Sequence, residues 1–559
     1  MSVSRVVGGR LSALALPMAA GAILGLALAC VVAPIRWDDQ SFYTWMAPRL
    51  LDGYRLYGAD LQDTNPPLIA WINILPTLLA RATGATPHAS FVAFVTALAV
   101  GAIVWSLRLA RSDRRASEAL PWLAVLLVYA TVILPSVWWK LSEISALGMG
   151  LRYDFGQREH FLVLLVLPYL FAAARRLAGE PLPGLEALAV GLVAALGFCI
   201  KPQYLTVVAA VEAVIVVHAR SLRPLVRPEL VALVLGGLVY CAIVWLVTPG
   251  YFAVIPTFAA IYGDFGHQTA WQIMLLSKYH FAVAAAAVLG LVLLRGAGAM
   301  RPAAAVVLAA GIAAFAAFLL QAKGWTDHLL PADTFITVAI GLALIGRDTR
   351  SAPDRRGPVM DLATAAIAGA SCLVALAFYY PARAAEWADS VWAHHIAAFN
   401  AATAAYPPGT GFLILSEAIY SQYDIAMDRG FVWASRYPFL ILPEETIRAE
   451  RTGDDARHSG YPVISDVLGA SGRRGPDARQ YATMLRRQVV EDFERWKPAI
   501  VLVQRCGDPV MEPCLFGEGF RVVDWLKANP AFSAIWSHYA FDRSLWRFDL
   551  YLLKGSGPH

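Results

Sequence analysis

The sequence has little charge for its length. Only 16% of its 559 residues are charged, whereas about 25% is usual for a soluble protein. Hydrophobic residues make up 58% of the chain, and the mean hydropathy is +0.54. Many apolar runs approach the roughly 20 residues that a helix needs to cross a bilayer. The composition therefore excludes an ordinary soluble protein and predicts a polytopic membrane protein.

The signatures of several large protein classes are also missing. The sequence contains no Walker loop, no zinc signature and no serine-hydrolase elbow. Its net charge of +5 is small, and no basic stripe is interleaved with aromatic residues, so we expect no nucleic-acid partner. We find no fixed-period repeat and no inverted duplication of the kind that many secondary transporters have.

Cysteine is scarce, with six residues in the chain. Four of them lie in or at the end of apolar segments, where cysteine behaves as a small hydrophobic residue. Cys506 and Cys514 lie in the polar C-terminal region instead. If that region is extracytoplasmic, a local disulfide between them is possible, and the sequence leaves this question open.

The apolar runs and the arginines together predict a topology. Inner loops that carry at least two arginines each place the N-terminus in the cytoplasm and the segment 381–559 outside, because cytoplasmic loops are enriched in Lys and Arg. The segment 66–83 is short and contains Pro76, so we expect a helix at the outer interface. The eleven predicted spans are 12–34, 88–109, 119–138, 160–177, 184–200, 203–219, 229–248, 280–295, 303–320, 331–346 and 361–380.

The tail is more polar than the rest of the chain. Phe412–Leu415 and Ala499–Val503 read as buried strands, and the alternating segment Arg547–Leu553 reads as a late or edge strand. Arg479–Trp496 is predicted to be a helix, and Gly453–Gly475 a loop. We therefore expect two domains, a transmembrane domain 1–380 with an outer loop 35–87 and a periplasmic α/β domain 381–559. His394 and His395 are expected to form a surface pair.

The stretch Ile35–Leu68 carries the clearest functional signal. It begins with the adjacent carboxylates Asp38 and Asp39 directly after the first span, continues through an aromatic amphipathic run, and ends at Asn65-Pro66-Pro67. Acidic groups at the mouth of a membrane span are costly to place there, which makes a functional role plausible. The alternative is that either aspartate merely caps the helix expected from Ser41.

Other ionisable groups collect on the same predicted side of the membrane. They lie in the outer loops 138–160, 201–203, 249–278 and 321–332. A scaffold would not need such a concentration of polar groups at one face. We therefore expect these loops to form one site.

The acidic dipeptide in the first outer loop and the Pro-Pro segment about 25 residues later resemble the GT-C glycosyltransferases. The closest sets are the ArnT-like lipid A aminoarabinose transferases, the rhizobial galacturonosyltransferases and the protein O-mannosyltransferases. The resemblance covers about residues 1–350 and implies an integral membrane enzyme with a polyprenyl-phosphate sugar as donor. Two positions depart from the family pattern, since Gln40 stands where a Glu is expected and Asn65 where a Lys often precedes the Pro-Pro.

The resemblance and the chemistry of glycosyl transfer together suggest roles for the outer-loop residues. Transfer needs a base for the acceptor hydroxyl and cations for the leaving phosphate. We assign the base to Asp39, with Asp38 as a second carboxylate. The candidate phosphate-binding residues are Lys201, Arg158, His160, Lys323 and His328, and the candidate sugar or acceptor residues are Trp325, Tyr153, Asp264 and His267.

Simpler structural roles remain open for these residues. Lys201 could extend from a span end to the interface, Arg158 and His160 could anchor a helix start, and the Lys323–His328 segment could belong to an aromatic belt. A divalent metal ion is possible, with Glu159 and Asp38 as candidate ligands, although no ligand spacing is diagnostic.

The sequence thus predicts a polytopic α-helical membrane protein of about eleven transmembrane helices with a C-terminal extracytoplasmic α/β domain. The predicted activity is an inverting transfer of a sugar from a polyprenyl-phosphate donor to the hydroxyl of a lipid, polysaccharide or protein acceptor, at the outer face of the inner (cytoplasmic) membrane. The alternatives are a flippase of lipid-linked sugars and a non-enzymatic membrane scaffold with a periplasmic binding module.

Overall fold

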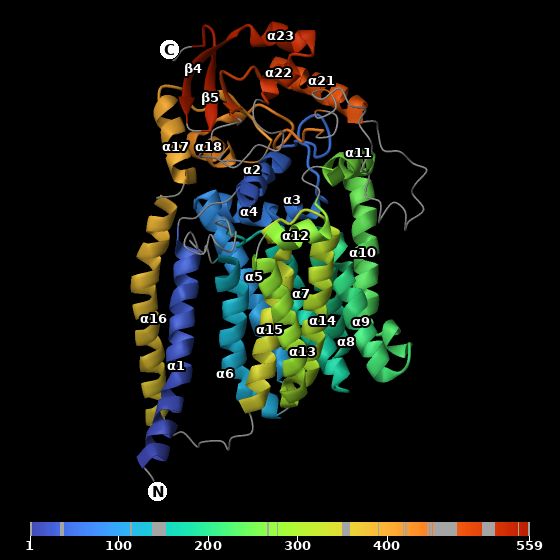
Figure 1. The fold of residues 1–559 in the computed structure, drawn as a ribbon, viewed down its shortest axis with the longest axis vertical. Coiled ribbons are helices and arrows are strands. Elements are labelled where there is room, and N and C mark those ends of the chain that lie inside the picture. Colours follow the sequence, from blue (N-terminus) through green and yellow to red (C-terminus); the bar gives the residue numbers. More distant parts are fainter. Residues whose placement is uncertain are drawn as a thin grey trace. The chain divides into compact units, whose positions relative to one another are not determined.

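The structure is a computed structural model, and the chain in it forms two compact units, each built from segments far apart in sequence (Figure 1). Unit 1 comprises residues 1–35, 79–241 and 268–387, and unit 2 comprises residues 36–78, 242–267 and 388–559. Whether these units correspond to the domains expected from the sequence stays a prediction. The described residues are 3–33, 38–111, 114–136, 153–264, 268–276, 278–348, 358–388, 391–417, 419, 422–443, 447, 450, 478–505, 520–545 and 547–556.

Unit 1 is helical, as the apolar runs predict. Nine helices in the described part of the chain are long and apolar enough to cross a membrane, and shorter apolar helices cover Leu16–Val32 and Gly184–Ile200. Each of the eleven predicted spans corresponds to one of these helices. The main helices are α1 (Val3–Val32), α5 (Pro87–Ala110), α6 (Arg114–Val128), α7 (Arg158–Leu177), α8 (Gly184–Ile200), α9 (Leu205–Ala219), α10 (Pro228–Val247), α12 (Ala270–Leu276), α13 (Lys278–Leu293), α14 (Arg301–Leu320), α15 (Leu330–Asp348) and α16 (Pro358–Ala388).

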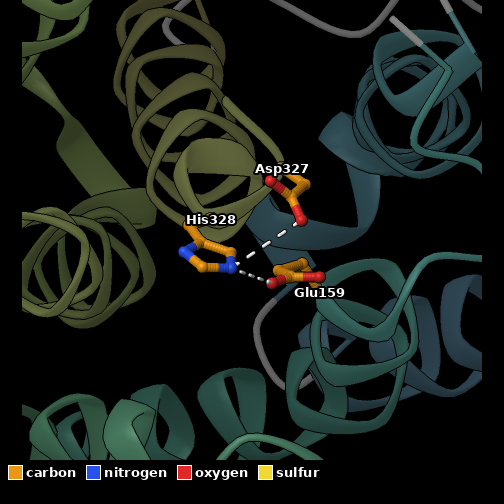
Figure 2. Close-up of side chains that lie close together, drawn as sticks. All are labelled: Glu159, Asp327 and His328. Atoms are coloured by element: carbon orange, nitrogen blue, oxygen red, sulfur yellow. Dashed lines mark ion pairs between the residues drawn. The ribbon is translucent and has the colours of Figure 1, made fainter. Parts of the chain in front are cut away.

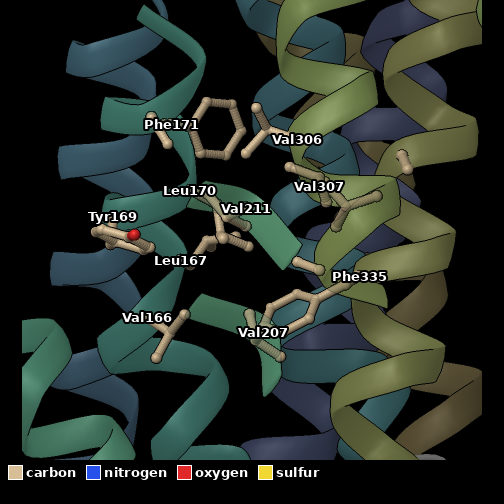
Figure 3. Packing of buried hydrophobic residues seen from close by; sticks show 14 of the residues in the cluster. Val166, Leu167, Tyr169, Leu170, Phe171, Val207, Val211, Val306, Val307 and Phe335 are labelled. Carbon is tan, nitrogen blue, oxygen red and sulfur yellow. The ribbon is translucent and has the colours of Figure 1, made fainter. Parts of the chain in front are cut away.

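Helix α7 is the centre of this bundle. It contacts α5, α8, α9, α14 and α15, and all its residues from Arg158 to Ala174 are buried. Figure 3 shows Leu167 and Leu170 of α7 close to Val211 of α9, within a larger buried cluster to which Val307 of α14 also belongs. Because α7 is surrounded by other helices, the position of its first turn is fixed by packing on every side.

Two glycines allow α1 and α16 to pack closely. Gly21 and Gly25 are four residues apart on α1, the spacing of small residues at tight helix contacts in membranes. A Cβ at Gly21 would overlap the carbonyl of Ala368, and one at Gly25 would overlap the carbonyl of Cys372. The two helices therefore meet backbone to backbone, and they run side by side in Figure 1.

Replacing both glycines should separate this helix pair. We expect Gly21→Leu/Gly25→Leu to cost about 2 kcal/mol or more of stability, because each added side chain overlaps backbone that has nowhere to move. Leu24→Trp is the matched control, since Leu24 is 49% exposed and faces away from the contact. Thermal unfolding in detergent measures both variants, and equal unfolding temperatures for both would contradict the close packing.

One buried cluster of charged residues in unit 1 is centred on Glu212, and its charged groups pair with one another. Both carboxylate oxygens of Glu212 accept hydrogen bonds from Arg227, and one also accepts from the Tyr169 hydroxyl. Arg227 also pairs with Glu229, 3.0 Å away, and Glu229 in turn accepts two hydrogen bonds from Arg176. Glu212, which lies in the middle of the predicted span 203–219, is thus neutralised within the protein, as burial in an apolar bundle requires.

Unit 2 contains a five-stranded mixed sheet with helices around it. The strand order is β2-β1-β3-β5-β4, in which β2, β1 and β3 are parallel and β5 is antiparallel to both its neighbours. The strands are β1 (Gly411–Leu415), β2 (Val432–Trp433), β3 (Ile500–Gln504), β4 (Tyr539–Leu545) and β5 (Phe548–Leu553). The main helices are α2 (Asp38–Leu51), α3 (Leu68–Ile72), α11 (Gly250–Asp264), α17 (Val391–Ala402), α18 (Gln422–Arg429), α21 (Ala478–Trp496), α22 (Val522–Leu526) and α23 (Pro530–Trp536).

Most elements expected in the tail are present. The strands at 412–415 and 499–503 and the helix at 479–496 are confirmed within a residue or two. The segment 547–553 is a late strand but not an edge strand, because it lies between β3 and β4 in the sheet. The predicted loop 453–475 and the cysteines Cys506 and Cys514 lie outside the described residues.

The prediction that His394 and His395 form a surface pair is wrong for His395. His394 is exposed, but His395 is buried, 1% exposed, and its ring packs 4.9 Å from that of Phe548 in β5. The amphipathic helix α17 turns adjacent residues to different faces, so one histidine faces the sheet. Burial, together with the nearby charge of Arg547, lowers the pKa of His395 to about 4.

This buried histidine should make unit 2 sensitive to acid. The unfolded chain takes up the proton near pH 6.5 and the folded chain only near pH 4, so stability is lost as the pH falls through this window, by about 2 kcal/mol between pH 7 and pH 5. We expect His395→Phe to remove this part of the pH dependence and His394→Phe to keep it. Tryptophan-detected thermal unfolding at both pH values measures the difference.

Candidate functional site

The candidate site in unit 1 is built around the first turn of α7. The chain enters the helix through a tight turn in which Gly156 has a φ of +81°, and a Cβ there would overlap the ring of Phe91. The Gly156 amide donates a hydrogen bond of 2.9 Å to Nδ1 of His160. This turn sets the direction of Arg158 and Glu159, the first two residues of the central helix.

Glu159 forms the core of the site with Lys201. Its carboxylate oxygen Oε1 lies 2.7 Å from Nζ of Lys201, and Lys201 donates to Nε2 of His328 over 3.2 Å. Figure 2 shows Glu159 and His328 facing each other together with Asp327, with Nε2 of His328 at 3.6 Å from Glu159 and 3.8 Å from Asp327. Three outer loops expected to meet are thus brought together by side-chain contacts.

Local backbone structure presents these groups. Lys201 lies between α8 and a short turn at Pro202–Tyr204, in an extended conformation that ends the helix. Asp327 and His328 lie in the 3₁₀ turn Thr326–Leu329 before α15. The Tyr204 hydroxyl donates to the backbone carbonyl of His328 and so joins the two turns.

The cluster is buried and dense in charge. Glu159 is fully buried, and Arg158, Lys201, Lys323, Asp327 and His328 are all buried as well. Burial of an unpaired ion costs several kcal/mol, so these groups must neutralise one another or a ligand. Among the described residues, Oε2 of Glu159 and Nδ1 of His328 have no hydrogen-bond partner. The paired core therefore keeps one free acceptor and one free ring nitrogen.

The same side chains also offer ligand atoms for a metal ion. Glu159, Asp327 and His328 each offer a ligand atom, and these atoms lie within 4.8 Å of one another. However, Nζ of Lys201 touches both Glu159 and His328, and its ammonium therefore occupies the position of the cation. A metal ion would fit only if Lys201 moved away from Glu159 and His328.

The remaining candidates of this unit lie at different distances from the core. Trp325 is 5.4 Å from the ring of His328, and Nζ of Lys323 lies 5.8 Å from the Trp325 ring. Tyr153 is buried and packs 6.1 Å from Phe155. The ring nitrogens of His160 bond to the backbone of Gly156 and Thr131, which favours a positioning role.

The carboxylates of the first outer loop belong to unit 2. Asp38 and Asp39 form the first turn of α2, where the helix dipole favours negative charge. Asp39 is partly exposed, and the side chain of Asp38 lies outside the described residues. Asn65 donates its backbone and side-chain N–H groups to Asp63, and Asp63 also accepts from the Tyr43 hydroxyl. Asp264 ends α11 with a side chain outside the described residues, as is all of His267.

Sequence reasoning missed two acidic groups of unit 1. Asp327 is expected only as an ordinary charge of the Lys323–His328 loop, yet it contacts His328. Asp333, in the first turn of α15, accepts a hydrogen bond from the Tyr279 hydroxyl and is not one of the three clustered residues. The available signal was a second acidic residue at the start of a predicted span, the same signal that singled out Asp38 and Asp39.

Comparison with known proteins gives matches in structure but none in sequence. No protein-family model matches the chain, and no curated protein matches it either. The crystal structure of ArnT from Cupriavidus metallidurans bound to undecaprenyl phosphate matches with a TM-score of 0.50 at 12% identity, with 100% of both chains covered. The apo structure of the same enzyme gives 0.50 at 10% identity over 98% of each chain.

A cryo-EM structure of the arabinofuranosyltransferase AftD from Mycobacteria gives a TM-score of 0.41 at 14% identity, over 97% of this chain and 40% of that one. The fold of this chain is similar to that of ArnT over its whole length, and the resemblance seen in the sequence is confirmed at the level of the fold. It is a multi-pass membrane protein whose mixed α/β region follows the helical part.

The stability of the folded protein should depend strongly on the pairing of Lys201 with Glu159. We expect Lys201→Met to cost about 3–5 kcal/mol, because it leaves the Glu159 carboxylate buried without a counter-charge. The double variant Glu159→Gln/Lys201→Met should recover part of this loss, since no buried charge remains unpaired. Gln203→Met, on an exposed neighbour, is the control. Thermal unfolding in detergent measures all three, and a stable Lys201→Met protein would contradict the pairing.

Proposed function

We propose that this chain is a glycosyltransferase that moves a sugar from a polyprenyl-phosphate donor to an acceptor hydroxyl. The observation that carries the proposal is the buried Glu159–Lys201–His328 cluster at the head of the central helix, in a fold shared over its whole length with ArnT. ArnT was crystallised with undecaprenyl phosphate, a ligand whose phosphate needs cations in a dry environment.

The cationic residues Lys201, Arg158 and Lys323 are the proposed phosphate-binding groups. An ammonium or guanidinium group stabilises the negative charge of a leaving phosphate far better in a water-excluded site than in water. When a lipid phosphate enters, the ammonium of Lys201 contacts the phosphate with a further N–H while it stays paired with Glu159, and the free Nδ1 of His328 can add a hydrogen bond. Trp325 supplies an apolar face for the sugar or the prenyl chain, and Tyr153 remains a candidate for contact with the sugar or acceptor.

Asp39 is the proposed general base. The acceptor hydroxyl gives its proton to the Asp39 carboxylate as its oxygen attacks the anomeric carbon from the side opposite the phosphate. The bond between that carbon and the phosphate oxygen breaks, and polyprenyl phosphate leaves with the electron pair. This single displacement inverts the anomeric configuration and needs no covalent enzyme intermediate. Asp38 is the alternative base, and Asp264 and His267 are candidate acceptor contacts.

The proposed setting is the outer face of the bacterial inner membrane, with the N-terminus in the cytoplasm and the C-terminal region in the periplasm. The arginines of the inner loops support this orientation. The acceptor is a lipid, a polysaccharide or a protein that carries a free hydroxyl. The assay below uses a cell-envelope extract, which offers all three kinds of acceptor together.

The decisive experiment is transfer of radiolabelled sugar from polyprenyl-phosphate donors to a cell-envelope extract. We expect the wild type to transfer label and Asp39→Asn to lose at least about 100-fold in rate, since a general base contributes 10²–10⁴-fold. Asp524→Asn, on an exposed side chain of unit 2, is the matched control and should keep full activity.

Two other results of this experiment would change the proposal. Transfer that persists in folded Asp39→Asn but is lost in Asp38→Asn would move the base to Asp38. No transfer from any donor, combined with movement of lipid-linked sugar across liposome membranes, would overturn the transferase in favour of a flippase.

A further inference from the structure

Unit 2 contains a pocket of about 200 Å³ that the proposed transfer reaction does not use. Several separate segments build it, namely α2, the loop that follows it, β2 with the residues after it, and the end of α21. The lining residues are Trp45, Arg49, Asp52, Tyr54, Asp60, Leu61, Val432, Trp433, Ser435 and Trp496. Because segments far apart in the sequence converge here, the pocket is a product of the tertiary fold.

Aromatic rings make up much of the wall. Trp45 and Trp433 are both buried, and Trp496 and Tyr54 are partly open to solvent at the rim. The indole of Trp433 is held by a hydrogen bond of 3.0 Å from its Nε1 to the carbonyl of Tyr437. Flat aromatic faces offer apolar contact to the C–H faces of a sugar ring, and rigid rings lose little entropy on binding.

The polar groups of the pocket are also held in place. Asp60 accepts a bond of 2.7 Å from Arg495 and another from the amide of Arg55, and the bond from Arg495 lowers its pKa below the usual value. Ser435 donates to Asp492, which also pairs with Arg436 at 2.7 Å. Pre-organised groups of this kind reduce the cost of binding.

Arg49 differs from these groups, because it has no salt bridge among the described residues, although the nearby Asp52 carboxylate favours its charged form. Its guanidinium stacks 3.8 Å from the centre of the Trp45 ring and donates one hydrogen bond of 2.8 Å, to the carbonyl of Trp45. Burial lowers the pKa of Arg49 to about 10, so it stays charged at neutral pH. A guanidinium presents five N–H donors in a planar fork that matches carboxylate or phosphate oxygens.

We propose that this pocket binds a single sugar ring that carries an anionic group. The sugar ring packs on the more exposed Trp496 and Tyr54, its hydroxyls bond to Asp52 and Asp60, and its carboxylate or phosphate pairs with Arg49. The volume suits one ring and is below the range of pockets for larger ligands. None of the lining residues belongs to the Glu159–Lys201 cluster, and binding of the sugar requires neither a donor nor transfer.

The test is saturation-transfer NMR on the full-length protein in detergent, with glucuronate, glucose 6-phosphate, glucose and glucosamine as probes. We expect at least one of the two anionic sugars to bind about tenfold more tightly than glucose, and glucosamine to bind no better than glucose. The anionic probe that binds more tightly identifies whether the group is a carboxylate or a phosphate.

Variants connect the signal to the pocket. Arg49→Gln should reduce the preference for the anionic sugar about tenfold while leaving glucose binding unchanged, and Trp496→Leu should weaken every probe. Arg543→Gln, at an exposed position on β4, should change nothing. If Arg49→Gln fails to fold, Arg49→Lys keeps the charge and loses the planar fork, and the rim variant Trp496→Leu still tests the site.

Three results would overturn the proposal. They are no saturable binding of either anionic sugar, equal binding of glucose and the anionic sugars, and anionic-sugar binding that survives both Arg49→Gln and Trp496→Leu. A chain that binds the anionic sugar but transfers none would leave this site standing and the transferase refuted, so the two proposals fail separately.

Discussion

The carboxylate of Glu159 imposes the main constraint on unit 1. It lies fully buried at the start of the most central helix, where a lone charge would cost several kcal/mol. Lys201 must therefore reach it from the end of α8, and the turn before α15 must bring His328 against Lys201. One buried charge thus determines the positions of the turns at Lys201 and His328, and the Tyr204 hydroxyl reinforces the contact between these turns. The apolar packing of α7 supplies the rigid frame that makes this pairing possible.

Much of unit 1 could be predicted from sequence, because a bilayer allows few solutions. Each helix needs a long apolar run, and those runs located all eleven predicted spans. The polar residues left between the spans had to gather at the ends of the helices. Lys201, Arg158, Lys323 and His328 were identified in this way, and the structure buries all four. Their roles in binding remain a proposal.

The sequence alone does not show which residues come into contact in the folded chain. His395 and His394 are adjacent and chemically identical, and only the packing of α17 against β5 separates a buried ring from an exposed one. The place of β5 inside the sheet was equally hidden, because its alternation fits an edge strand and an inner strand alike. Asp327 was missed for the same reason, since its significance comes from His328 and Glu159 around it and not from its neighbours in the chain.

The two buried ionic clusters of unit 1 differ in a way that bears on function. Around Glu212 the network is closed: Arg227 meets both oxygens, Tyr169 adds a bond, and Glu229 is itself paired with Arg176. Such a cluster has nothing left to offer a ligand, and its role is to hold helices together. Around Glu159 one oxygen and one nitrogen of His328 have no partner among the described residues, although both are buried, and this costs stability. Buried hydrogen-bonding groups without a partner suit a site for an ionic headgroup, because a bound phosphate can accept hydrogen bonds from His328 and Lys201 while Lys201 stays paired with Glu159.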